Sequence, residues 1–310
     1  MRSIGIFHFL RPVAVCACLG LGWSSPVSAL TFNITTAANA SLSAAQAAAF
    51  NTAATAWSAV LSDPITVNLQ VGFVSLGSGI LGSTYLTLES LPTASVVAAL
   101  GTDAKDANDA KAVASIAALP PTTPNLELTS AQAKALGYSF TGNDAVIEFS
   151  TNYTFSTGRD AQGGTPAGQY DLIGVAEHEI GHALGFVSSF DFNGDLTVLD
   201  LFRYTSFDTR ASTTGSTFFS LDKGATSLAK FSPGANDNYQ ASHWLQGTGS
   251  LMDPAVAAGV SQNITALDIK ALDVIGYDVI VVAEPASLTL LFGGIALAIA
   301  RRRRPDANAA

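Results

Sequence analysis

Residues 172–185 read LIGVAEHEIGHALG, and inside them His178-Glu179-Ile180-Gly181-His182 forms the pattern H-E-x-x-H. The apolar residues of this stretch recur at helical spacing, which predicts an α-helix. Asp171 is of a type that caps helix N-termini, and Gly185 can adopt the left-handed conformation that ends a helix. On such a helix His178 and His182 lie one turn apart and can bind the same ion.

This pattern predicts metal-assisted hydrolysis. Two imidazoles on one helix face suit zinc, which binds histidine nitrogen at about 2.0–2.1 Å. Zinc lowers the pKa of a water molecule toward about 7, so a carboxylate one residue after the first histidine can take a proton from that water. Glu179 is therefore the candidate general base, and the same carboxyl can then protonate a leaving amine.

The third ligand has two candidates. The sequence contains four histidines, and the only ones after His8 are His178, His182 and His243. Asp191 competes with His243 because it follows the helix closely and carboxylates also bind zinc. If His243 is the ligand, its replacement should remove the metal, whereas replacement of Asp191 or Ser188 should change metal binding little.

These motifs resemble those of the metzincin zinc peptidases, whose pattern continues as H-E-x-x-H-x-x-G-x-x-H. Gly185 matches the glycine, but Ser188 stands where the third histidine is expected. In the leishmanolysin-like branch, a long insertion precedes a third histidine in a Ser/Ala-His-Trp context, and a methionine turn follows shortly. This chain has Ala241-Ser242-His243-Trp244 and then Leu251-Met252-Asp253-Pro254. The resemblance implies that His178, His182 and His243 hold one zinc ion and that Met252 forms a turn beneath it.

The resemblance also implies the fold. We expect an α+β domain over residues 30–280, with a mixed sheet, an active-site helix and a cleft between two lobes. The upper lobe should span about 30–185 and the lower lobe about 186–280. The chain departs from leishmanolysin in having no cysteine after Cys18, which excludes disulfides from this domain.

Local patterns predict the other elements. Apolar residues at helical spacing follow Ser43, and alternation at period two predicts a strand over 65–73. We expect a short strand over 145–149 to be the edge strand that aligns a peptide substrate by backbone pairing. The remaining expectations are one or two surface helices within 90–119, a loop over 156–169, short strands and loops over 186–240, and a helix from Thr265 to Gly276.

A calcium site is a second metal hypothesis. Residues 191–195, Asp-Phe-Asn-Gly-Asp, are rich in oxygen ligands. Their glycine is misplaced for an EF-hand loop and no matching glutamate follows, so a solvated turn is the preferred interpretation.

Both ends of the chain have the features of targeting segments. Residues 1–29 combine basic residues, an apolar run over 13–21 and a small-residue site at Val27-Ser28-Ala29, as a secretory signal peptide does. Cleavage there makes Leu30 the first residue of the mature protein. The alternative, a membrane anchor, is disfavoured because the apolar run is shorter than the roughly 20 residues of a bilayer span.

Residues 281–310 resemble a PEP-CTERM sorting signal of Gram-negative bacteria. Glu284-Pro285 precedes a short uncharged segment over 288–300 and the cluster Arg301–Arg304, although Ala283 replaces the first proline of the motif. The resemblance implies transient contact with the inner membrane, an exosortase-like processing enzyme as partner, and delivery to the cell surface or extracellular matrix. A lasting inner-membrane anchor facing the periplasm is the alternative.

The composition limits the partners. Residues 30–285 contain nine basic and 23 acidic residues, so their formal net charge is −14. The absence of a basic stripe argues against nucleic acid. A protein or peptide substrate is expected, although no pattern indicates its sequence. Two alternatives remain open: a non-enzymatic matrix or adhesion protein with a structural zinc site, and a metal-dependent hydrolase of another substrate.

In cells with an exosortase, we expect the surface form to lack residues 288–310, because a short span and an arginine block hold a chain only transiently. Intact-mass measurement of surface material tests this. Retention of residues 288–310 would support the lasting anchor.

Overall fold

The computed structural model describes residues 29–38, 40–117, 123–192, 194–234 and 238–280. The predicted signal peptide up to residue 28 and the sorting signal over 281–310 therefore lie outside the described residues. In the described part of the chain, no helix has the length and apolar character needed to cross a bilayer.

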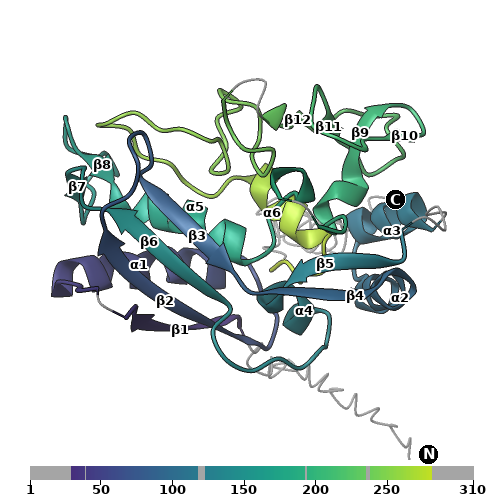
Figure 1. The fold of residues 1–310 in the computed structure, drawn as a ribbon, viewed down its shortest axis with the longest axis horizontal. Coiled ribbons are helices and arrows are strands. Elements are labelled where there is room, and N and C mark those ends of the chain that lie inside the picture. Colours follow the sequence, from purple (N-terminus) through teal and green to yellow (C-terminus); the bar gives the residue numbers. More distant parts are fainter. Residues whose placement is uncertain (1–28, 39, 118–122, 193, 235–237, 281–310) are drawn as a thin grey trace, which may run out of the picture.

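The fold is a mixture of helices and several small sheets, which agrees with the α+β class (Figure 1). The main sheet has the strand order β1-β2-β6-β3, in which β1, β2 and β6 are parallel and β3 is antiparallel to β6. The strands are β1 (Thr31–Thr36), β2 (Thr66–Val74), β6 (Ala145–Ser150) and β3 (Gly82–Leu86).

The expectation that residues 145–149 form the edge strand is wrong. They form β6, which pairs with β2 on one side and β3 on the other. The reason lies in the side chains, because Ala145, Ile147 and Phe149 are fully buried, as in a central strand. The edge strand next to β6 is β3, at the opposite edge of the sheet from β1, and its sequence GSTYL carries no apolar alternation by which it could have been recognised.

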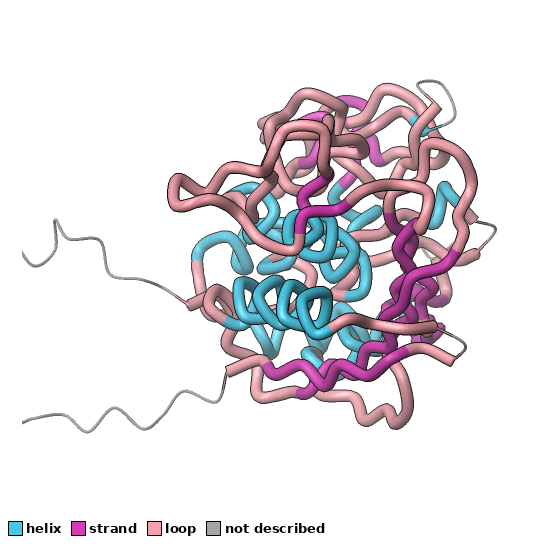
Figure 2. Tube along the Cα trace, turned by 90° about the vertical axis from the view of Figure 1, so that its left-hand side faces the viewer, coloured by secondary structure: helices cyan, strands magenta, loops and turns pink. Residues whose placement is uncertain are grey.

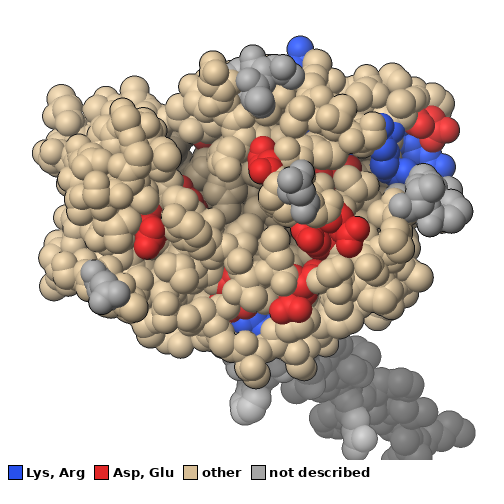
Figure 3. Space-filling view, in the orientation of Figure 1, with Lys and Arg blue, Asp and Glu red and all other residues tan. Residues whose placement is uncertain are grey.

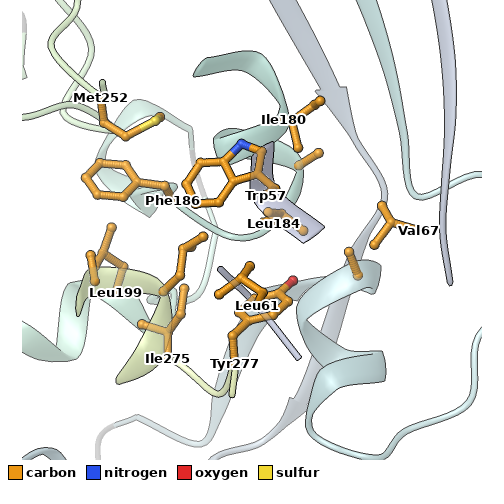
Figure 4. Packing of buried hydrophobic residues seen from close by; sticks show 14 of the residues in the cluster. Trp57, Leu61, Val67, Ile180, Leu184, Phe186, Leu199, Met252, Ile275 and Tyr277 are labelled. Carbon is orange, nitrogen blue, oxygen red and sulfur yellow. The ribbon is translucent and has the colours of Figure 1, made fainter. Parts of the chain in front are cut away.

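Helices α1 (Ala44–Ser58) and α5 (Leu172–Ala183) pack against each other, and Figure 2 shows the helices to one side of the strands. Ser43 caps α1 through a capping box with Gln46, which confirms the predicted start of that helix. At the helix interface, the fully buried Trp57 donates a hydrogen bond from Nε1 to the carbonyl of Glu177 at 2.9 Å. Figure 4 shows its indole with Ile180 of α5 on one side and Met252 on the other.

The rest of the N-terminal half builds a flank beside the sheet. The predicted surface helices are confirmed as α2 and α3, whereas the strand that precedes them was not predicted. The elements are β4 (Leu88–Pro92), α2 (Thr93–Asp103), α3 (Ala107–Ile116), β5 (Asn125–Thr129) and α4 (Ser130–Ala135), with β4 and β5 forming an antiparallel pair.

The C-terminal half consists mainly of loops and short elements, as expected. These are β7 (Phe155–Ser156), β8 (Tyr170–Asp171), the 3₁₀ turns η1 (Ser189–Asp191) and η2 (Leu199–Phe202), β9 (Arg203–Ser206), β10 (Thr209–Arg210), β11 (Phe218–Phe219), β12 (Ala229–Lys230) and α6 (Ala266–Asp273). Thr265 caps α6 through a capping box with Asp268. One hydrophobic cluster extends from Leu30 to Tyr277 and contains residues from both sides of position 185.

Replacing Trp57 with Phe should lower the free energy of unfolding by about 1–4 kcal/mol, because the variant loses a buried hydrogen bond and leaves a void between α1 and α5. Urea titration of the purified protein measures the change. Asn51→Ala, at an exposed position of the same helix, is the control and should change stability by less than about 0.5 kcal/mol. Equal stability of the wild type and the Trp57 variant would contradict this packing.

Candidate metal centre

Helix α5 carries the H-E-x-x-H residues and ends where the sequence predicted. Gly185 has φ of +115°, and the N–H groups of Phe186 and Gly185 donate to the carbonyls of Gly181 and His182, both at 3.0 Å. These bonds form the Schellman motif, which satisfies carbonyls at the helix end. The turn fixes the direction in which the chain leaves the site.

The start of α5 differs in detail from the prediction. Asp171 occupies the N-cap position, but its side chain makes no capping hydrogen bond. Its Oδ2 instead accepts hydrogen bonds from the Arg159 guanidinium, at 2.9 Å from Nε and 2.6 Å from Nη2. Arg159 also donates to the carbonyl of Gln262 and to Asn263. Asp171 binds Arg159, and Arg159 in turn connects the helix start to residues 262–263. A local capping rule does not predict these contacts.

The three histidines named from the sequence lie together. Their Nε2 atoms are 3.1 Å apart between His178 and His182, and 3.2 Å from each of these to that of His243. All three side chains are buried, with at most 9% of their surface exposed. The 60 residues between His182 and His243 therefore return the chain to the helix.

The second nitrogen of each ring is held by a backbone carbonyl. His178 Nδ1 lies 2.8 Å from the carbonyl of Leu251, His182 Nδ1 lies 2.8 Å from that of Phe186, and His243 Nδ1 lies 3.2 Å from that of Gln240. A carbonyl only accepts, so each Nδ1 carries the proton and each Nε2 presents a lone pair. Three lone pairs in contact repel one another unless a cation lies among them.

The spacing of these atoms fits such a cation. A tetrahedral ion with bonds of about 2.0–2.1 Å separates its ligand atoms by about 3.3 Å, close to the distances between the Nε2 atoms. Imidazole nitrogen suits zinc and several other divalent transition metals. The structure thus provides a group that could bind a metal ion, with His178, His182 and His243 as its members.

Electrostatics favour the neutral rings that metal binding requires. Burial lowers the pKa of His182 to about 3, with a further lowering by His178 and an opposing effect of the hydrogen bond to Phe186. Burial also holds the pKa of His243 well below its ordinary value, and the neighbouring histidines act in the same direction. Protons therefore compete weakly with a metal ion for these nitrogens near pH 7.

Glu179 lies on the same helix with only 6% of its surface exposed. Its Oε2 accepts a hydrogen bond of 2.7 Å from Oγ1 of Thr84 on β3, and its carbonyl accepts from the same hydroxyl at 3.1 Å. Burial raises the pKa of this carboxyl, while His178 and the Thr84 hydrogen bond lower it in part. Glu179 is thus held beside the candidate ligands and is not one of them.

Met252 lies against the metal-site helix, as the family resemblance implied for the methionine turn. A Cβ placed on Gly181 would lie 2.6 Å from its sulfur, so only glycine permits this approach. The residue before it, Leu251, supplies the carbonyl that orients His178. The turn therefore supports the site in two ways: its sulfur packs beneath the helix and its backbone fixes a ring.

Asp268 is a supporting residue that the sequence analysis missed. Its side chain is fully buried and accepts hydrogen bonds from Trp244 Nε1 at 2.9 Å, from the backbone N–H of Leu251 at 3.0 Å and from that of Met252 at 3.3 Å. It thereby connects the residue after His243 to the methionine turn. The signal available in the sequence was the Thr265-x-x-Asp268 capping pattern, which only indicates a helix start.

Asp191, the alternative third ligand, is not in the three-histidine group. Its Oδ1 accepts from the N–H of Ala241 at 2.6 Å, and its Oδ2 accepts from the N–H of Ser242 at 2.7 Å and from the Ser242 hydroxyl. It holds the two residues that precede His243. Ser188 donates from its N–H to the Ser242 hydroxyl and from its own hydroxyl to Asp200, so it too supports this segment.

The proposed calcium loop does not gather its carboxylates among the described residues. Asp191 is engaged with residues 241–242, whereas Asp195 accepts a hydrogen bond from Ser90 at 3.3 Å. Residue 193 lies outside the described part of the chain. The preferred interpretation of 191–195 as a turn is consistent with these contacts.

No family model, curated protein or solved structure matches this chain. Any statement about its function therefore depends on the geometry of the site and on the motifs of the sequence.

Replacing His243 with Ala should abolish stoichiometric zinc binding, because one of three metal-facing nitrogens is lost. The structure changes the expectation for Asp191→Ala, which should weaken binding by about 10- to 100-fold, as for other residues that orient a ligand. The matched control is Asp195→Ala, which removes a carboxylate from the same excursion and should leave affinity unchanged. Competition titration with a chromogenic chelator measures all three. Stronger loss of zinc in the Asp191 variant than in the His243 variant would contradict this ligand set.

Proposed function

We propose that this protein is a zinc-dependent endopeptidase of the metzincin type, most similar to the leishmanolysin-like branch. The observation that carries the proposal is the convergence of three unprotonated Nε2 atoms beside the carboxylate of Glu179. The Schellman turn at Gly185 and the packing of Met252 under Gly181 support the finer assignment.

The number of ligands favours catalysis over a structural role. Structural zinc sites are normally closed by four protein ligands, whereas catalytic sites use three and keep a position open. Within the described residues, the group around His178 contains three members. A matrix or adhesion protein with a structural zinc site is the alternative, and a fourth protein ligand would favour it.

Glu179 supplies the acid–base chemistry in this proposal. A zinc ion held by the three histidines would polarise the scissile carbonyl and lower the pKa of an attacking water. Glu179 takes a proton from that water and delivers it to the leaving amine nitrogen, and its carboxylate is thereby restored. The raised pKa that burial gives this carboxyl assists the second transfer.

The edge strand β3 supports a peptide substrate. In the described sheet β3 pairs only with β6, so its other edge offers backbone groups to an extended peptide. Thr84 brings this strand within hydrogen-bond distance of Glu179. Figure 3 shows a hollow in the surface, in the area where Figure 1 draws α5 between β3 and the loops of the C-terminal half. A cleft there would lie between the two proposed lobes.

The proposed setting is outside the cytoplasm. The predicted export and sorting signals favour a substrate among proteins of the cell surface or extracellular matrix, and the acidic composition gives no support to nucleic acid as a partner. The exosortase-like enzyme and the inner membrane are proposed as transient partners during processing.

The test is digestion of casein or a peptide library by the purified protein. We expect cleavage that 1,10-phenanthroline abolishes and added zinc restores. Glu179→Gln should keep zinc and lose at least about 100-fold in kcat/KM, since general acid–base catalysis contributes about 10²–10⁴-fold. Loss of zinc in that variant would make Glu179 a ligand. Full zinc content without any cleavage would favour the structural-zinc alternative.

A further inference from the structure

Two residues of β3, Gly82 and Thr84, lie against Glu179, and the role assigned to them below rests on the proposed function. Gly82 and Thr84 stand opposite Phe149 and Ile147 of β6, whose side chains are buried in the core. Residues two apart on a strand share a face, so Gly82 and Thr84 both face the helix side of the sheet. Along this face the edge strand therefore presents a hydrogen atom and a hydroxyl to the candidate base.

Thr84 makes the two oxygens of Glu179 unequal. Its hydroxyl donates to Oε2 at 2.7 Å and also to the Glu179 carbonyl at 3.1 Å. Among the described residues, no group donates a hydrogen bond to Oε1. This oxygen is also not one of the fully buried side-chain oxygens that lack a partner. The hydroxyl thus fixes one oxygen and leaves the other free to exchange a proton.

Gly82 provides the space for that free oxygen. A Cβ at position 82 would lie 2.6 Å from Oε1 of Glu179 and 3.0 Å from its Cγ and Cδ. Such distances require movement of the carboxylate, because real Cβ atoms do not approach oxygen so closely. The backbone of Gly82 is not in the left-handed region, so the requirement for glycine here is steric and comes from Glu179.

We propose that Gly82 and Thr84 form a positioning pair that assigns proton transfer to Oε1 of Glu179. Thr84 holds Oε2, keeps its own proton on Oγ1 throughout, and prevents rotation of the carboxyl. Gly82 keeps the path to Oε1 open. Oε1 then accepts the proton of the attacking water and returns it to the leaving nitrogen, so the carboxylate ends unprotonated. The strand that would align the substrate also aligns the base.

The kinetic test uses Thr84→Val, which keeps the shape and removes the donor, and Thr84→Ser, which keeps the donor. The Val variant should lose about 10- to 100-fold in kcat with KM changed by less than about threefold, since small misplacement of a reacting group has effects of this size. The Ser variant should stay within about threefold of the wild type. Gly82→Ala should resemble the Val variant. Asn51→Ala, at an exposed position of α1 away from β3, is the control and should match the wild type.

Zinc content and Tm are measured for every variant, so that loss of metal or of the fold is seen separately. Thr84→Ala replaces the Val variant if the latter does not fold. Equal impairment of the Ser and Val variants would overturn the proposal, because it would indicate a packing role. An increase in kcat in the Val variant would also overturn it, because the contact would then restrain the base.

A readout without activity separates this proposal from the proposed function. In the metal-free protein, a double-mutant cycle with Thr84→Val and Glu179→Ala should show coupling, seen as at least about a threefold non-additive change in the unfolding equilibrium constant. Absence of coupling would overturn the positioning pair, even if the wild type is an active peptidase. If the cycle shows coupling but the protein shows no chelator-sensitive cleavage, the contact between Thr84 and Glu179 is supported and the peptidase function is rejected.

Discussion

The central constraint on this structure is that three buried, unprotonated histidine nitrogens face one another, although they repel. His178, His182 and His243 are oriented by carbonyls from three separate places, namely residues 251, 186 and 240. Each carbonyl fixes a tautomer, and together they direct three lone pairs to one point. Apolar packing does not direct three lone pairs to one point, so polar interactions must hold the loops that carry these carbonyls.

Buried carboxylates hold those loops. Asp191 binds the backbone ahead of His243, Asp268 binds the turn at Met252, and Asp200 accepts hydrogen bonds from residues 188, 189 and 197. A buried charge is tolerated only when hydrogen bonds or an ion pair compensate its desolvation. The fully enclosed Arg203 lies 3.5 Å from Asp200, donates to the carbonyl of Ala241 at 2.6 Å, and so connects η2 with the His243 segment. The segments around η2 and His243 are therefore held by buried carboxylates and Arg203 more than by regular strands.

Sequence reasoning identified what repeats locally and missed what depends on the tertiary fold. The Ser43 cap, the C-terminal turn of α5 and the start of α6 follow from local patterns, and His178 and His182 follow from their spacing. His243 was implied by the family resemblance, and the structure brings it together with the other two histidines. Helix α6 ends at Asp273, before the predicted Gly276. The edge strand was misassigned because β6 has the apolar alternation and β3 does not. Asp191 was a ligand candidate because it follows α5 closely along the chain. Proximity along the chain does not show which partner a carboxylate contacts in the fold. Asp171 was predicted only as a helix cap and Asp268 was not singled out, because the partners of both side chains lie in other segments that only the fold brings near.

The excursion between Gly185 and His243 shows why a metal ion would matter to the fold as well as to chemistry. It spans 57 residues, over 186–242, and no cysteine occurs after residue 18 to close it. Closing a loop of this length costs conformational entropy, which is offset in part by hydrogen bonds that Asp191 accepts from Ala241 and that Arg203 donates to the Ala241 carbonyl. An ion bound by His182 before the excursion and by His243 after it would join the two ends directly and replace the repulsion between their nitrogens with attraction. Since such a site is not preformed in the unfolded chain, the binding free energy would also be folding free energy. The same three nitrogens that define the candidate site would then stabilise the loop that delivers the third of them.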